Sequence, residues 1–210
     1  MELRKYQHRA IEQLRDSLSS GKRRPVVQSP TGSGKTVIAA AIINMARDKG
    51  KRILFCVPAL TLIDQTVNRF RQNGIFEIGV MQGQHEMTDY EQPVQVCSIQ
   101  TLARRDIPKA DLVIIDEAHR MGGSTEQVAR YKLGAALAEA SPYLLLLSAT
   151  PHQGKTDQFL RLMQLLDREA FPDESSVNRD RVRPFVIRTE KRLSINADGQ
   201  PLFKPRVTRL

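Results

Sequence analysis

Apolar and polar positions follow two alternating patterns along the chain. Short, continuous apolar runs are separated by longer stretches in which apolar residues recur at helical spacing. The strand-like runs cover residues 25–28, 52–57, 76–81, 94–98, 111–116 and 143–148. The helix-like stretches cover residues 5–20, 35–49, 60–72, 126–140 and 155–167. This alternation predicts an α/β fold with a doubly wound, mostly parallel sheet and helices on both of its faces.

The pattern changes at about residue 168. The stretch "DREAFPDESSVNRDRVRP" is polar and punctuated by proline, and only one strand-like run, "FVIRTE", follows it. We therefore expect one domain over residues 1–167. Residues 168–210 are expected to form a basic, partly irregular C-terminal appendage.

Composition is that of an ordinary globular protein, with 40% hydrophobic and 26% charged residues. The first residues, "MELRKYQHR", are too polar for a signal peptide, and no apolar run approaches the length needed to cross a bilayer. A cytoplasmic location is therefore expected. Cys56 and Cys97 each lie in a strand-like run without a C-x-x-C partner, which indicates buried free thiols.

The net charge of +9 is concentrated at the two ends. Residues 1–24 hold seven Lys or Arg against three Asp or Glu, and residues 179–210 hold nine against three. Two interpretations stay open. The basic ends could contact nucleic acid or an acidic partner, or they could simply be solvated termini.

The stretch "SPTGSGKT", residues 29–36, stands between a strand-like run and a helix-like run. Gly32 and Gly34 allow a tight turn, Lys35 supplies a charge for phosphates, and Thr36 supplies a hydroxyl for Mg²⁺. A helix beginning here would point its N-terminus at an anion. The stretch therefore predicts a nucleotide-phosphate loop.

A second motif, "LVIIDEAH", places Asp116 and Glu117 at the end of a run that is apolar enough to be a central parallel strand. Ligands of doubly wound sheets bind beyond the carboxyl ends of the strands, so these carboxylates and the phosphate loop should face one another. Asp116 is predicted to hold Mg²⁺, and Glu117 to orient and deprotonate the attacking water. A metal site formed by these two residues with His119 and His152 is a weaker alternative.

Together these motifs resemble those of the superfamily-two helicases and translocases, whose strand-end motif reads DEAD, DEAH or a variant. The resemblance implies a RecA-like, three-layer P-loop domain that uses ATP and Mg²⁺. In this family Ser often replaces the leading glycine of the loop, as Ser29 does here. The segment "PTGSGKT" is then expected to bind nucleotide through Thr31, Gly32, Ser33, Gly34, Lys35 and Thr36, and the first helix through Gln7, which would recognise the adenine edge.

Three further segments match the family in order. "VPALTLIDQ" and "SIQTLARR" resemble the segments that hold a nucleic-acid backbone, which assigns that role to Thr61, Gln65 and Thr101. "LLLSATP" resembles the motif that couples the ATP site to nucleic acid through Ser148 and Thr150, and His119 is expected to act in the same coupling. The N-terminal half is more similar to RadD-like repair helicases and restriction-enzyme subunits, and the C-terminal part to bacterial SNF-type translocases.

The resemblance implies a motor domain of a DNA-dependent ATPase, with DNA more expected than RNA as its partner. In this family ATP is hydrolysed between two RecA-like domains, and residues 151–210 do not contain a second set of strands and helices. A second RecA-like domain, in the same chain or another, is therefore expected as a partner. The alternative is a module that binds ATP and DNA without appreciable hydrolysis on its own.

Overall fold

The computed structural model describes residues 3–122, 125–152, 154–189, 194 and 200–203. Parts of the predicted basic C-terminal appendage lie outside the described residues. The helices of the described residues are α1 (Lys5–Ser19), α2 (Lys35–Arg47), α3 (Ile63–Gln72), α4 (Ile99–Leu102), α5 (Thr125–Ala140), α6 (Thr156–Leu166) and α7 (Arg179–Val182). The strands are β1 (Val26–Gln28), β2 (Ile53–Val57), β3 (Ile78–Met81), β4 (Val94–Ser98), β5 (Leu112–Ile115), β6 (Tyr143–Ser148) and β7 (Val186–Arg188).

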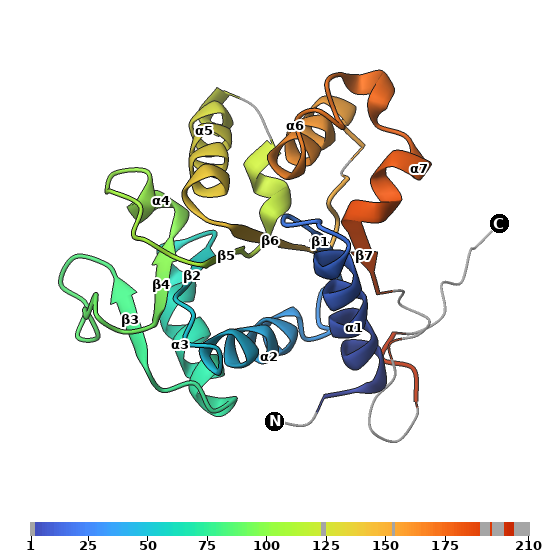
Figure 1. Ribbon diagram of the computed structural model, residues 1–210. Helices are drawn as coiled ribbons and strands as arrows, with labels where there is room; N and C mark the ends of the chain where they lie inside the picture. The colour runs from blue at the N-terminus through green and yellow to red at the C-terminus, as the bar shows by residue number, and fades with distance from the viewer. Residues whose placement is uncertain (1–2, 123–124, 153, 190–193, 195–199, 204–210) are drawn as a thin grey trace.

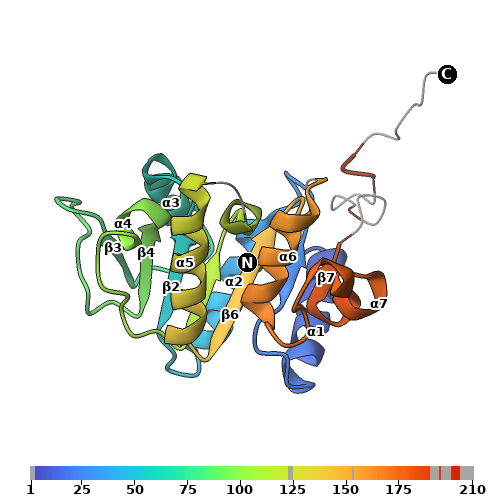
Figure 2. The ribbon, with the colours of Figure 1, turned by 90° about the horizontal axis from the view of Figure 1, so that it is seen from above.

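The strands form one seven-stranded sheet in the order β3-β4-β2-β5-β6-β1-β7, and every neighbouring pair is parallel. Helices α1, α2 and α3 cover one face, and α5 and α6 lie side by side over the other (Figures 1 and 2). The prediction of an α/β fold with a doubly wound parallel sheet is confirmed. Because all carboxyl ends lie at one edge, the loops that follow the strands gather there.

Two apolar layers hold the sheet between its helices. On one face the buried side chains of α2 pack against β2 and β4, and on the other those of α6 pack with β5 and β6. All five residues of β2 are buried, which explains why its sequence "ILFCV" is continuously apolar rather than alternating. Helix α2 is so apolar, "VIAAAII", because six consecutive residues from Ile38 to Ile43 are buried.

The C-terminal segment joins the sheet beyond the expected domain end at residue 167. Strand β7 pairs with β1 in parallel, with Val27 opposite Ile187, and the Thr189 N–H donates to the Gln28 carbonyl at 2.8 Å. The rings of Phe171 and Phe185 meet edge to face with their centroids 5.2 Å apart. Part of the predicted appendage therefore extends the core.

Cys56 and Cys97 are both buried free thiols, as predicted. They lie opposite each other on β2 and β4, and their sulfur atoms are 3.7 Å apart. Burial raises the pKa of the Cys97 thiol well above its usual range, so it stays protonated at neutral pH. No described helix is long and apolar enough to cross a membrane.

Candidate nucleotide site

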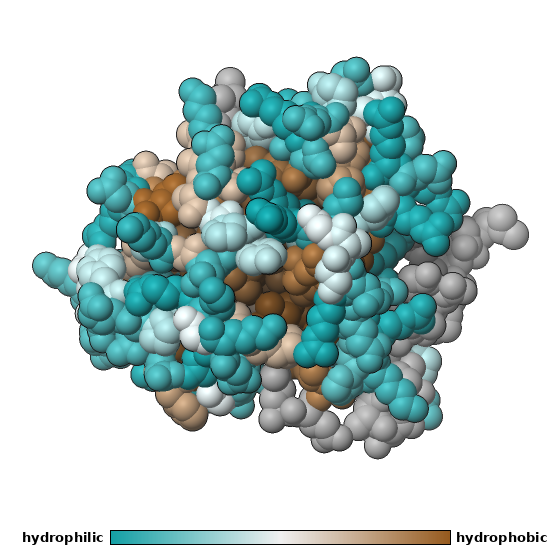
Figure 3. Space-filling model, viewed as in Figure 1, coloured by the Kyte–Doolittle hydropathy of each residue, from teal (hydrophilic) through white to brown (hydrophobic). Residues whose placement is uncertain are grey.

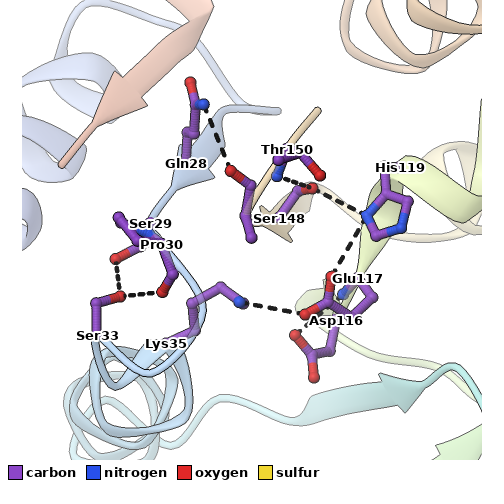
Figure 4. Close-up of polar contacts among 11 residues, drawn as sticks. Gln28, Ser29, Pro30, Ser33, Lys35, Asp116, Glu117, His119, Ser148 and Thr150 are labelled. Atoms are coloured by element: carbon purple, nitrogen blue, oxygen red, sulfur yellow. Dashed lines mark hydrogen bonds and ion pairs between the residues drawn. The ribbon is translucent and has the colours of Figure 1, made fainter. Parts of the chain in front are cut away.

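The candidate site lies at the carboxyl edge of three adjacent strands. Strands β5, β6 and β1 are neighbours in the sheet, and each leads into one of the predicted motifs. The "SPTGSGKT" loop follows β1, Asp116 follows β5, and Ser148 is the last residue of β6. Motifs from three separate parts of the sequence are therefore brought together (Figure 4).

The phosphate loop has the backbone that its glycines allow. Gly32 and Gly34 have φ angles of 80° and 83°, a left-handed region that favours glycine. A Cβ on Gly34 would lie 2.7 Å from the Gln7 side-chain nitrogen, so a larger residue at this position would have to displace the Gln7 side chain. Helix α2 begins at Lys35, and the N–H groups of Gly34, Lys35 and Thr36 make no hydrogen bond to a described residue. Such a helix terminus is suited to an anion.

Two serines hold the loop from within. The hydroxyls of Ser29 and Ser33 lie 2.6 Å apart, and Ser33 also donates to the Pro30 carbonyl at 2.5 Å. Both serines are fully buried. The sequence predicts Ser33 as a nucleotide-binding residue, whereas in the structure its hydroxyl faces the loop itself. The sequence signal for this contact was the presence of two serines four residues apart in one short glycine-containing loop.

The first helix is joined to the loop by two hydrogen bonds to one carbonyl group. The Tyr6 hydroxyl donates to the Ser33 carbonyl at 2.6 Å, and the Gln7 Nε2 amide donates to the same oxygen at 3.2 Å. Gln7 Oε1 accepts from the Arg4 N–H at 2.9 Å, and the Gln7 side chain is buried. Gln7 therefore lies against the loop with both ends of its amide engaged. Its role in recognising adenine stays a prediction.

A chain of polar contacts crosses from the phosphate loop to the end of β6. Lys35 Nζ lies 3.2 Å from Glu117 Oε1, and the other oxygen, Glu117 Oε2, lies 3.3 Å from His119 Nδ1. The same His119 nitrogen is 3.1 Å from Ser148 Oγ, which accepts from the Thr150 N–H at 3.3 Å. All five of these residues are candidates from the sequence, and Figure 4 shows them pointing toward one another.

Glu117 and Asp116 carry the negative charge of the site. Glu117 has a φ of 49°, the only positive φ of a non-glycine residue in the described chain. The left-handed backbone costs about 1–2 kcal/mol for such a residue, and it is the conformation in which Glu117 meets Lys35 and His119. Burial, and secondly the charge of Glu117, raise the pKa of Asp116. Lys35 acts in the opposite direction.

His119 is held as a neutral ring at physiological pH. Burial lowers its pKa, and the nearby carboxylate of Glu117 opposes this only in part. An ionised carboxylate can only accept hydrogen bonds, so we assign the proton to Nδ1, the nitrogen that faces Glu117. This nitrogen lies between Glu117 and Ser148, and the role of His119 in coupling stays a prediction.

The remaining nucleotide and metal candidates lie in the same loop and turn. Thr31 is exposed within the loop, and Thr36 lies in the first turn of α2. No hydrogen bond joins Thr36 to Asp116 in the described chain, and an Mg²⁺ held through water does not need one. The alternative metal site is not supported, because no group of three or more acidic, His or Cys residues in the described part of the chain could share a metal ion. His152 instead packs edge to face on Phe159.

The three nucleic-acid candidates lie at the same edge of the sheet but farther along it. Thr61 and Gln65 are exposed, in the turn after β2 and at the start of α3. Thr101 lies in α4 after β4, where its hydroxyl is 3.0 Å from that of Ser98. Nothing in the described structure joins these three side chains to the Lys35–Glu117 contact. Their proposed role stays a prediction.

Comparisons with known proteins agree with this arrangement. A family model described as "Type III restriction enzyme, res subunit" matches residues 1–153. RNA polymerase-associated protein RapA of Photobacterium profundum is 32% identical over 169 residues, which cover 71% of this chain and 17% of that protein.

Two solved structures share the fold. The Sulfolobus solfataricus SWI2/SNF2 ATPase core in complex with dsDNA has a TM-score of 0.76 at 18% identity, with 90% of this chain and 44% of that chain covered. The UvsW helicase from bacteriophage T4 has a TM-score of 0.59 at 22% identity, over 77% of this chain and 57% of that one. This chain thus spans less than a fifth of RapA and less than half of the ATPase core.

Proposed function

The chain belongs to the family described as the res subunit of type III restriction enzymes, and from this premise we propose that it is the ATP-binding motor domain of a DNA-dependent ATPase. Such a domain, in a helicase or a translocase, couples hydrolysis of Mg·ATP to movement on nucleic acid. The resemblance to superfamily-two helicases and translocases that the motifs predicted is confirmed by the family match and by the RapA relative.

The observation that carries the proposal is the polar chain from Lys35 through Glu117 and His119 to Ser148. A phosphate loop alone supports nucleotide binding only. Here the carboxylate proposed to activate water contacts the phosphate-binding lysine with one oxygen and faces the histidine with the other. A change in what Lys35 binds would therefore change the surroundings of Glu117, then of His119 and of the "SAT" segment. That is the connection a motor needs.

In the proposed site Lys35 and the free N–H groups at the start of α2 would bind the β- and γ-phosphates. The Thr36 hydroxyl and Asp116 would hold Mg²⁺, and the donor set fits, because Mg²⁺ takes oxygen ligands and commonly uses one or two carboxylates with phosphates and water. At this position the metal ion would supply positive charge that offsets the negative charge of the phosphates. Glu117, released from Lys35, would accept a proton from the attacking water.

DNA and a second RecA-like domain are the proposed partners. One of the structures that shares the fold is an ATPase core bound to dsDNA. The chain covers only 44% of that core, which leaves room in such a protein for a further domain. Residues Thr61, Gln65 and Thr101 are the proposed contacts to the nucleic-acid backbone.

Steady-state hydrolysis of ATP, measured without DNA and with single- or double-stranded DNA, tests the proposal. We expect DNA to raise the rate, and Glu117→Gln to remove the hydrolysis while leaving Mg·ATP binding intact. Glu169→Gln is the matched control, because Glu169 is an exposed glutamate outside the site. Hydrolysis that survives Glu117→Gln at the normal rate would reject the catalytic assignment.

One observation favours a second candidate function, a module that binds ATP and DNA without appreciable hydrolysis alone. Lys35 and Glu117 occupy each other in this conformation, so the proposed base is not free to act. A second RecA-like domain would then be needed for turnover. Binding of both ligands with no hydrolysis, restored by adding the second domain of a relative, would identify this case.

A further inference from the structure

A large groove lies at the opposite edge of the sheet from the nucleotide site. It has a volume of about 800 Å³ and is bounded by α1, the end of α2 and the amino-terminal ends of β5 and β6. Helix α2 runs from Lys35 at the nucleotide site to Arg47 near the groove. Thirteen helical residues span roughly 20 Å, so an occupant of the groove would not touch the phosphate loop.

The floor and walls of the groove are mainly hydrophobic. Leu18, Met45, Ala46 and Leu112 are only partly buried there, and Tyr143 is 42% exposed. Figure 3 shows hydrophobic residues at the bottom of a hollow in the centre of this face. A contiguous apolar surface that is rimmed by polar residues is typical of an interaction site.

The rim of the groove carries more positive than negative charge. Its cations are Arg15, Arg23, Lys49 and Lys51, and its acids are Asp48 and Asp111. Lys51 is paired with Asp111 at 3.1 Å. Within the described chain none of the other three cations forms an ion pair, and the Arg15 guanidinium lies 2.8 Å from the Met45 sulfur, over the apolar wall.

We propose that this groove binds an acidic amphipathic helix of a partner protein. The apolar stripe of such a helix would fill the floor, as in other helix-in-groove complexes. Glutamate or aspartate beside the stripe would meet the three cations that have no acidic partner. The charge of the rim disfavours a basic occupant. The proposal does not depend on the proposed motor function, because the groove and the nucleotide site share no residue.

A fluorescein-labelled peptide is the probe, with leucine at helical spacing and glutamate at the remaining positions, and its binding is followed by anisotropy. A peptide with lysine in place of every glutamate is the comparison. We expect the glutamate peptide to bind at least about tenfold more tightly, and its affinity to fall as salt is raised. Equal affinity for the two peptides, or no binding of the glutamate peptide, would overturn the proposal.

Two variants locate the binding. Ala46→Glu places a charge on the apolar wall, and the double change Arg15→Glu with Lys49→Glu reverses two exposed rim charges; each should weaken binding at least about tenfold. Phe76→Glu is the control for the first, because Phe76 is an exposed hydrophobic residue outside the groove. Arg104→Glu with Arg179→Glu is the control for the second. Unchanged binding in both groove variants would contradict the proposal.

Because Ala46→Glu can weaken packing of α2, the exposed double change provides the test if that variant unfolds. Size-exclusion chromatography of the unmodified protein tests for a different occupant. A dimer that Ala46→Glu converts to monomers would show that the groove holds a second copy of this chain and would overturn the partner-helix proposal. A monomer in both cases agrees with it.

Discussion

The nucleotide site and the candidate nucleic-acid segments lie along the same edge of the sheet, but they are built differently. Ser29, Ser33 and Ser148 are fully buried, and hydrogen bonds or ion pairs connect Lys35, Glu117, His119 and Ser148 into one chain of contacts. Thr61 and Gln65, by contrast, are exposed and make no side-chain hydrogen bond within the described chain.

This difference reflects the two kinds of ligand. A phosphate group is small and highly charged, so the groups that bind it must be held in place before it arrives. A nucleic-acid backbone is long and repeats, and each contact contributes little by itself. Substitutions in the first region should therefore have large effects at single positions, and those in the second should have small effects that accumulate.

The largest effect is expected for Lys35→Ala, which should weaken Mg·ATP binding about 100-fold. Hydrogen bonds to charged groups contribute about 1.5–3 kcal/mol, and Lys35 would make more than one. Its loss also leaves Asp116 and Glu117 facing the phosphates without compensation. Titration calorimetry measures this, with Lys109→Ala as the control because Lys109 is exposed and outside the site. Unchanged affinity in Lys35→Ala would remove the contrast between the two regions.

A smaller effect, about tenfold, is expected for Gln7→Ala. This change removes the hydrogen bonds to the Ser33 carbonyl and the Arg4 N–H, each contributing about 1 kcal/mol. If Gln7 also recognises adenine, the unmodified protein should prefer ATP to GTP, and Gln7→Ala should reduce that preference. Competition between the two nucleotides separates the roles. A variant that loses affinity equally for both would show that Gln7 only supports the loop.

Much of the nucleotide site could be predicted because its signals are local in sequence. The spacing of Gly32, Gly34 and Lys35 predicts a loop before a helix, and an apolar run ending in Asp116 predicts a central strand. The contact of Tyr6 with the loop could not be predicted, because it depends on how α1 packs against a loop 27 residues away in sequence.

In the fold, too, elements with a local sequence pattern could be predicted, and those without one could not. Strand positions were predicted within two residues, because a buried parallel strand is a continuous apolar run. The four-residue helices α4 and α7 were not predicted, since they are too short for a helical period to show. The pairing of β7 with β1 brings together residues about 160 positions apart, and no local pattern specifies it.

The pH dependence of stability tests how much the ionised Asp116 carboxylate destabilises the folded state. Asp116 has a raised pKa, so its ionisation lowers the stability of the folded state as pH rises through that value. Asp116→Asn keeps an oxygen that can accept from the Glu117 N–H and removes the charge. The variant should therefore melt at a higher temperature than the unmodified protein at pH 7, with the difference shrinking as pH falls toward 4. Thermal melts by circular dichroism measure this, and a constant difference across that range would contradict it.

The smallest effect is expected in the nucleic-acid segments, where Thr61 is exposed and Thr101 is partly buried. Thr61→Ala with Thr101→Ala should weaken binding to a labelled oligonucleotide by about three- to tenfold without changing ATP affinity, because each lost hydrogen bond to the backbone contributes about 0.5–1.5 kcal/mol. Binding should be insensitive to sequence and should weaken steeply with salt, since release of cations from phosphates favours it.

The basic C-terminal end could bind DNA without these threonines, so the two sources must be separated. Removing the chain after about residue 178 would also remove β7 from the sheet. Changing Lys204, Arg206 and Arg209 to glutamine removes positive charge from the C-terminal end and leaves β7 in place, so it is the better control. If the threonines hold the backbone, their substitution lowers affinity by the same factor with or without these lysine and arginine changes, because distant, independent contacts contribute additively. Anisotropy over a salt series measures both variants and their combination. If only the changes of Lys204, Arg206 and Arg209 weaken binding, the segments that carry Thr61 and Thr101 are not a nucleic-acid site. The contrast drawn with the nucleotide site would then not hold.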